Sequence, residues 1–279
     1  MPAVTRTMSS AQAPPNLVDG IAALAAHVAE SEARVLTGEE MAARYVREVE
    51  CKVAALSRKE LAPLLVGVAE KRLVTAVKLA GEFLGLGYLG DYALENGIPF
   101  SLSRAADQVR EICRIAGLEY GFTEEMLFRL CRFYESEAIV ETTGSARSKL
   151  QRYILKSSDV LLAQAVALSA AGLCLDEASV RCLGAAAAAL DVVDDWEDRD
   201  EDLQHQARNP FAALQSLDGS AERCTYLFRQ LAAPYCADLI GGLASYRLCH
   251  SLRAYCAGVL SRVRATGLEL SGQACLIRS

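Results

Sequence analysis

Apolar residues recur three or four positions apart along almost the whole chain, with polar residues between them. This spacing places the apolar side chains on one face of an α-helix. No stretch alternates apolar and polar residues over the length of a half-buried strand. The pattern therefore predicts an all-α protein whose helices bury their apolar faces in one bundle.

Capping and breaking residues predict where the helices begin and end. Two stretches match the capping-box pattern that starts a helix, Thr37-Gly38-Glu39-Glu40 and Ser57-Arg58-Lys59-Glu60. The first helix should run to about Leu56, and the second, bent at Pro63, to about Gly81. A loop-rich region is predicted after it by Gly85, Gly87, Gly90, Gly97 and Pro99.

Further helices are expected at about 103–115, 123–141, 146–173 and 176–202. Asn209-Pro210 marks a restart, and one or two more helices should cover 220–266. The chain has neither an internal repeat nor a clear linker. We therefore expect residues 18–279 to form a single domain that follows a mobile N-terminal tail of residues 1–17.

The overall composition excludes several classes of protein. The chain has 279 residues, 52% of them hydrophobic, and a formal net charge of −6. This acidic balance argues against a nucleic-acid-binding protein, which would carry a basic surface. No apolar run reaches the ~18 residues of a membrane span, so no transmembrane segment is expected.

The ten cysteines are scattered and contain no CxxC pair, which argues against a zinc ribbon or a thioredoxin-like site. Most lie at apolar positions of predicted helices, where a free cysteine behaves as a small hydrophobic residue. No secretory signal precedes them. Reduced thiols and the absence of a signal indicate a cytoplasmic protein.

The strongest candidate for chemistry is the acidic cluster Asp194-Asp195-Trp196-Glu197-Asp198, which has the pattern DDxxD. At ~100° per residue, four aspartates fall on one stripe of a helix: Asp191, Asp195, Asp198 and Asp202. Asp194 lies beside this stripe. Carboxylates in this arrangement repel one another unless they share a cation. Mg²⁺ suits hard oxygen ligands and phosphates. We therefore expect a magnesium site for a diphosphate, with Asp191, Asp194, Asp195 and Asp198 as ligands.

The alternative is that the acidic cluster is an ordinary solvated surface. Two features argue against it. Five consecutive alanines at 185–189 precede the cluster, as in a helix that neighbours pack closely, and Trp196, the only tryptophan, lies inside it. An EF-hand is excluded, because the sixth loop position has no glycine and the twelfth no glutamate.

Basic residues flank the acidic helix on both sides. Lys156-Ser157 lies in the preceding predicted helix, and a short loop makes the two helices antiparallel neighbours. Arg208 follows the cluster, next to the restart at Pro210. Phosphate contact and solvated surface are both open for the arginines of the last helices, Arg247, Arg253, Arg262 and Arg264. Cations and metal-bound carboxylates around one pocket are what the departure of a diphosphate requires.

In this order, Lys156-Ser157, the DDxxD cluster and Arg208 near Pro210 resemble the class I isoprenoid (terpenoid) synthases, which include the trans-prenyltransferases and the terpene cyclases. The resemblance covers about residues 153–214. It implies a helical bundle of the class I terpenoid synthase type that binds Mg²⁺ on the aspartates. It also implies that Asp194, Asp195 and Lys156 are catalytic, and that Lys156 and Arg208 bind the diphosphate of the substrate.

That superfamily has a further aspartate-rich motif upstream, which this chain lacks. The nearest acidic groups are Asp91 with Glu95, and Glu135 with Glu137 and Glu141. We therefore expect a terpene synthase, a carbon–oxygen lyase that ionises one prenyl diphosphate and cyclises or rearranges the carbocation. The alternatives are a chain-elongating prenyl diphosphate synthase and a non-catalytic helical subunit or scaffold. The oligomeric state is open, a homodimer being one option.

Overall fold

The computed structural model describes residues 15–37, 39–95, 101–137, 146–205, 209–218, 221–244 and 248–266. These residues contain helices and no strand, which confirms the predicted all-α class. In chain order the helices are α1 (Pro15–Thr37), α2 (Glu39–Leu56), η1 (Ser57–Leu61), α3 (Glu70–Glu95), α4 (Leu102–Ala116), α5 (Tyr120–Glu137), α6 (Ala146–Lys156), α7 (Ser158–Ala170), α8 (Glu177–Glu197), α9 (Arg199–His205), α10 (Pro210–Asp218), α11 (Ala221–Ala244) and α12 (His250–Ala265).

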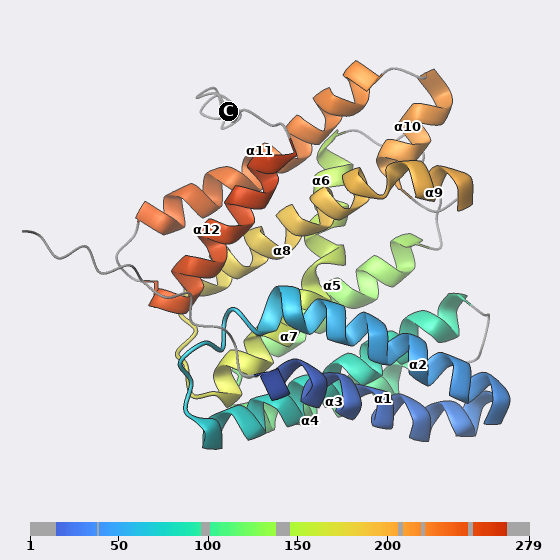
Figure 1. Cartoon of the computed structure of the whole chain (residues 1–279), viewed down its shortest axis with the longest axis vertical. Helices are drawn as coiled ribbons and strands as arrows, with labels where there is room; N and C mark the ends of the chain where they lie inside the picture. Colours follow the sequence, from blue (N-terminus) through green and yellow to red (C-terminus); the bar gives the residue numbers. More distant parts are fainter. Residues whose placement is uncertain are drawn as a thin grey trace, which may run out of the picture.

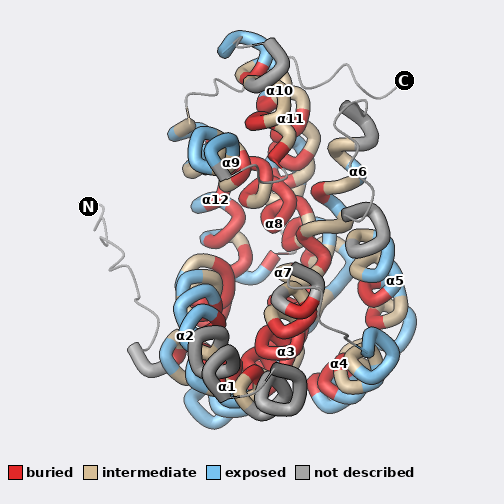
Figure 2. The backbone as a smooth tube through the Cα atoms, turned by 90° about the vertical axis from the view of Figure 1, so that its right-hand side faces the viewer, coloured by how far each residue is buried: buried red, intermediate tan, exposed pale blue. Residues whose placement is uncertain are grey.

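The helices α1 to α4 pack together in one part of the molecule, and α8 lies among α6, α11 and α12 in the other (Figure 1). Helix α7 joins the two parts, because it contacts α3 and α4 as well as α8. One apolar core extends through both parts, and the buried stretches of α3, α7 and α8 mark it in Figure 2. The acidic helix α8 is therefore a central element of the bundle.

Several predicted boundaries are confirmed by capping contacts. Asp176 caps α8, since its carboxylate accepts a hydrogen bond from the Ser179 N–H at 2.8 Å. Asn209 caps α10, and its Oδ1 atom accepts from the Phe211 N–H at 2.8 Å. The two long helices predicted over 146–173 and 176–202 are each divided in two, at Ser157 and at Asp198.

The helix predicted to start at Ser57 is wrong, because α2 continues into the π-helix η1. The Ala62 N–H donates to the Ser57 carbonyl at 2.8 Å, the five-residue spacing of a π-helix. Pro63 has no N–H and cannot extend an α-helical ladder. The next helix, α3, begins only at Glu70.

The predicted loop after Gly81 is also wrong, since α3 continues to Glu95. A Cβ atom at Gly85 would lie 2.8 Å from the Ala25 carbonyl oxygen of α1. The glycine thus permits close packing of α3 against α1 rather than a break. Gly97 and Pro99 lie outside the described residues.

The predicted boundary between the N-terminal tail and the bundle also needs adjustment. Helix α1 begins at Pro15 and Leu17 is buried, so the bundle begins before the predicted boundary at residue 17.

The segment Glu70–Asp91 of α3 is long and apolar enough to cross a membrane. Because 56% of its most apolar window is buried in the protein, and α3 packs on α1 and α7, its apolar character fits a core helix equally well.

Candidate functional site

Asp195 is the buried member of the acidic cluster, with 9% of its surface exposed. The Tyr153 hydroxyl donates to its Oδ2 atom at 2.7 Å, and Lys156 Nζ donates to its Oδ1 atom at 2.9 Å. Both donors lie at the end of α6. This confirms the prediction that the segment around Lys156 lies beside the acidic helix α8. Burial lowers the pKa of Lys156, but Asp191 and Asp195 more than offset this and hold that pKa above its usual value.

Asp194 joins three separate elements of the fold. Arg262 of α12 donates from Nη2 to Asp194 Oδ1 at 2.7 Å and to Glu197 Oε2 at 2.8 Å. Lys59 of η1 forms an ion pair with the other oxygen of Asp194. The sequence offered Arg262 only as one of four possible arginines and gave no reason to choose Lys59.

Asp191 and Asp198 have the least compensated charges of the cluster. The Oδ2 atom of Asp191 is buried and has no hydrogen-bond partner in the described residues. Burial raises the pKa of Asp191 to about 7; Lys156 lowers it, whereas Asp159, Asp195 and Asp194 raise it. Burial and the charge of Asp194 also raise the pKa of Asp198. Asp194 repels both carboxylates, and a cation placed between Asp194 and either of them would relieve that repulsion.

Asp191, Asp194 and Asp198 are three and four residues apart and so follow one side of α8. Their carboxylate oxygens are the hard ligands that Mg²⁺ prefers. Within the described part of the chain, however, no three acidic, histidine or cysteine side chains converge as a preformed ion site. Metal binding here would require Lys59 and Arg262 to leave Asp194.

The segment after α8 is held by Asn209. Its Nδ2 atom donates to the Asp195 carbonyl and, at 2.7 Å, to Asp202 Oδ2. Asn209 is buried, and it fixes α10 against the end of the acidic helix. Arg208, the predicted phosphate ligand, lies outside the described residues.

Trp196 has a packing role within the cluster. Its ring lies 5.5 Å from that of Phe211 and 5.0 Å from that of Phe228, centroid to centroid. The guanidinium of Arg199 covers the ring at 4.3 Å. The tryptophan thus anchors the acidic end of α8 to α10 and α11.

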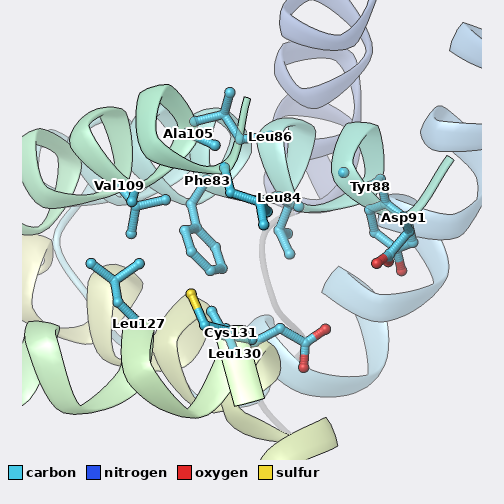
Figure 3. A pocket seen from close by; sticks show the side chains of 15 residues that line it. Phe83, Leu84, Leu86, Tyr88, Asp91, Ala105, Val109, Leu127, Leu130 and Cys131 are labelled. Carbon is cyan, nitrogen blue, oxygen red and sulfur yellow. The ribbon is translucent and has the colours of Figure 1, made fainter. Parts of the chain in front are cut away.

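An apolar pocket lies between α3, α4 and α5, with acidic residues at its edge. Its cavity volume is about 90 Å³, against the ~10–15 Å³ that one water needs. Figure 3 shows Tyr88 and Asp91 at one end, away from the apolar walls. Those walls are formed mainly by Phe83, Leu84, Leu86, Val109, Leu127 and Leu130.

The acidic edge of the pocket lies close to the cluster on α8. Asp159, which also lines the pocket, is three residues after Lys156. Burial raises the pKa of Asp159 to about 7, and Asp91 adds to the rise. Asp159 in turn raises the pKa of Asp191, so the two carboxyls are near each other. The side chain of Glu95, and those of Glu135, Glu137 and Glu141, lie outside the described residues.

Comparisons of the chain with protein-family models, with curated proteins and with solved structures found no match. The resemblance to isoprenoid synthases therefore rests on the sequence motifs of this chain alone.

Proposed function

We propose that the protein is a Mg²⁺-dependent enzyme of the class I terpenoid synthase type. It ionises a prenyl diphosphate and cyclises or rearranges the resulting carbocation. The observation that carries this proposal is the convergence of Lys59, Lys156 and Arg262, from three different elements, on the adjacent carboxylates of Asp194 and Asp195. Cations and carboxylates gathered beside an apolar pocket suit a ligand with an anionic head and an apolar tail.

The cations supply the chemistry of diphosphate recognition. Lysine and arginine donate charge-assisted hydrogen bonds to phosphate oxygens, and they neutralise the charge that develops on a departing diphosphate. Asp195, whose other oxygen accepts from Tyr153, holds Lys156 in a fixed position, so this lysine is preorganised for the task. Lys59 and Arg262 are half-buried, and each can exchange a carboxylate oxygen for a phosphate oxygen.

The aspartates supply the chemistry of metal binding. Asp191, Asp194 and Asp198 would hold the Mg²⁺, since Asp191 has an unpaired buried oxygen and burial together with nearby carboxylates raises the pKa of Asp191 and Asp198. When bound there, Mg²⁺ supplies Lewis-acid stabilisation of the diphosphate leaving group. Asp195 is fully engaged with Tyr153 and Lys156, so its proposed part is to orient Lys156.

The apolar pocket supplies the environment for the hydrocarbon. Its walls are mainly apolar and would keep the hydrocarbon, and a carbocation formed from it, away from groups that could capture the cation. Phe83 and Tyr88 are the aromatic residues that line it, and an aromatic face can stabilise a cation. Asp91 and Asp159 orient the negative end of the pocket toward α8, where we propose that the metal-bound diphosphate lies.

A second candidate function is a non-catalytic helical subunit or scaffold. One observation favours it: all four side-chain oxygens of Asp194 and Asp195 already bind groups of the protein itself. On this alternative the acidic cluster is a structural network that ties η1, α6 and α12 to α8. A chain-elongating synthase is the third option, and it needs a site for a second diphosphate.

The deciding experiment is to incubate the protein with Mg²⁺ and geranyl, farnesyl or geranylgeranyl diphosphate, each alone and with isopentenyl diphosphate. Products are identified by mass spectrometry. A hydrocarbon or alcohol from one substrate, lost in Asp194→Asn and retained in Asp107→Asn, supports the proposal; Asp107 pairs with Arg110 away from the site. A longer diphosphate indicates elongation. No product, together with no rise in Tm on adding Mg²⁺ and diphosphate, favours the scaffold.

A further inference from the structure

Glu60 is a carboxyl group in the core of the protein, only 4% exposed. Its Oε2 atom accepts hydrogen bonds from the Tyr255 hydroxyl of α12 and, at 3.2 Å, from Gln164 Nε2 of α7. Gln164 Nε2 also donates to the Tyr255 hydroxyl at 2.8 Å. Three helices, η1, α7 and α12, thus meet at one buried carboxyl group. Burying a carboxylate costs free energy unless it is paired and hydrogen-bonded.

The second oxygen of Glu60 faces the candidate site. Glu60 Oε1 lies 3.9 Å from Lys59 Nζ, the same ammonium group that pairs with Asp194. Both residues belong to the π-turn η1, a type of turn that often occurs at functional sites. Glu60 and Asp194 therefore share one cation, Glu60 from the core and Asp194 from the site.

The charges around Glu60 place its protonation in the neutral range. Burial raises its pKa to about 7, while the Tyr255 hydrogen bond and the charge of Lys59 lower it. Asp191 and Asp194, which face it from α8, raise it. Gln164 of α7, which also donates to Glu60, is uncharged. The position of Lys59 therefore has a direct effect on the charge of Glu60.

We propose that Glu60 takes up a proton when a bound diphosphate draws Lys59 away, so that anion binding at the site is coupled to protonation of the core. This inference rests on the proposed function, because it needs an anion at Lys59. Without the nearby ammonium group, a buried carboxylate has lost its compensating charge, and a proton from solvent replaces it. Glu60 is thus a positioning residue that allows Lys59 to change partner without leaving a bare charge in the core.

Isothermal titration calorimetry tests this coupling. Inorganic diphosphate with Mg²⁺ is titrated near pH 7 in buffers of different ionisation enthalpy, and the dependence of the observed heat on the buffer gives the protons taken up. If the pKa of Glu60 rises by about one unit on binding, the wild-type protein should take up about half a proton more than Glu60→Gln. Protons exchanged by diphosphate itself cancel in this difference. Glu124→Gln, which alters a half-exposed pair with Arg110, should match the wild type.

Tyr255→Phe provides a second test in a protein that keeps Glu60. The Tyr255 hydrogen bond lowers the pKa of Glu60, so its loss should move the pH of maximal proton uptake upward. A purely structural role for Tyr255 would leave that pH unchanged. Equal proton uptake by the wild type and Glu60→Gln, or an unshifted maximum in Tyr255→Phe, overturns the coupling while leaving the anion site intact. No binding of Mg²⁺-diphosphate to the wild type refutes the proposed function, and the coupling with it.

Discussion

Lys156 and Asp195, 39 residues apart in the sequence, form an ion pair of 2.9 Å between the end of α6 and the end of α8. The Tyr153 hydroxyl occupies the other oxygen of Asp195. Both oxygens of the buried Asp195 carboxylate are therefore hydrogen-bonded, which fixes the geometry of its pair with the half-buried Lys156.

Lys156→Met should lower the free energy of unfolding by about 2–4 kcal/mol, because it leaves the Asp195 carboxylate buried without its cation. Urea unfolding at pH 7 measures this change. Asp195→Asn in the same background should recover part of the loss. Arg181→Met, which removes an exposed pair with Glu177, is the control and should cost less than about 0.5 kcal/mol. Equal effects of the two Met variants would contradict the role of Lys156 as the cation that compensates the buried Asp195 carboxylate.

Arg262→Gln should separate recognition of the anion from stability. Arg262 is half-buried and pairs with two carboxylates, so we expect a stability loss of at most about 1 kcal/mol. Loss of a charge-assisted contact should weaken the binding of Mg²⁺-diphosphate by about tenfold. Calorimetry and thermal unfolding of the same sample measure both effects. Arg129→Gln, altering a pair with Glu125 on α5, should leave diphosphate affinity unchanged.

Asp191→Asn should stabilise the ligand-free protein at high pH. The pKa of Asp191 is about 7 in the folded protein and ~3.9 when unfolded, so the folded state binds the additional proton between these values. The free energy of unfolding of the wild type therefore falls as pH rises from about 4 to about 7, and levels off above. Asparagine has no such charge, and we expect a gain of about 1–3 kcal/mol at pH 8.

Urea unfolding of Asp191→Asn and the wild type from pH 5 to pH 8 measures this gain, which should shrink as pH falls toward about 4. The same variant should lose the rise in Tm produced by Mg²⁺ with diphosphate, since Asp191 is a proposed metal ligand. A gain that is independent of pH would show that Asp191 is ionised at no cost in the folded protein.

Gly85→Ala should destabilise the protein by about 1–3 kcal/mol, because its Cβ would lie 2.8 Å from the Ala25 carbonyl oxygen and 3.0 Å from Val28 Cβ. Gly87→Ala, two residues along the same helix, is the matched control. A Cβ at Gly87 meets no atom within 4 Å, and alanine favours a helix over glycine by up to about 1 kcal/mol. In thermal unfolding, the Tm should therefore fall for Gly85→Ala and rise for Gly87→Ala.

The sequence predicted those parts of the fold that depend on local signals. Asp176 and Asn209-Pro210 mark true helix starts, because a cap acts through neighbours two or three residues away. The same kind of signal failed at Ser57, where a capping pattern coincides with a π-turn before Pro63. It failed again at Gly85, where contact with a distant helix decides the conformation.

The candidate site, too, could be predicted only where it depends on local sequence signals. The DDxxD stripe could be predicted, because the period of a helix determines which side chains share a face. Its partners Lys59 and Arg262 could not, since they lie 135 and 68 residues from Asp194 and only the packing of η1 and α12 brings them there. Glu60 has no sequence signal of its own, because burial alone makes its charge unusual.

The two contacts of Asp194, to Lys59 and to Arg262, have a consequence for how the binding of the two proposed ligands is coupled. Moving Lys59 or Arg262 away from Asp194 costs free energy unless another cation pairs with the carboxylate and an anion pairs with the displaced side chain. Each of the two proposed ligands should therefore increase the affinity for the other, and by the same factor. Free diphosphate and free Mg²⁺ would both bind weakly by themselves, so the resting protein would discriminate against phosphate compounds that do not carry their own metal.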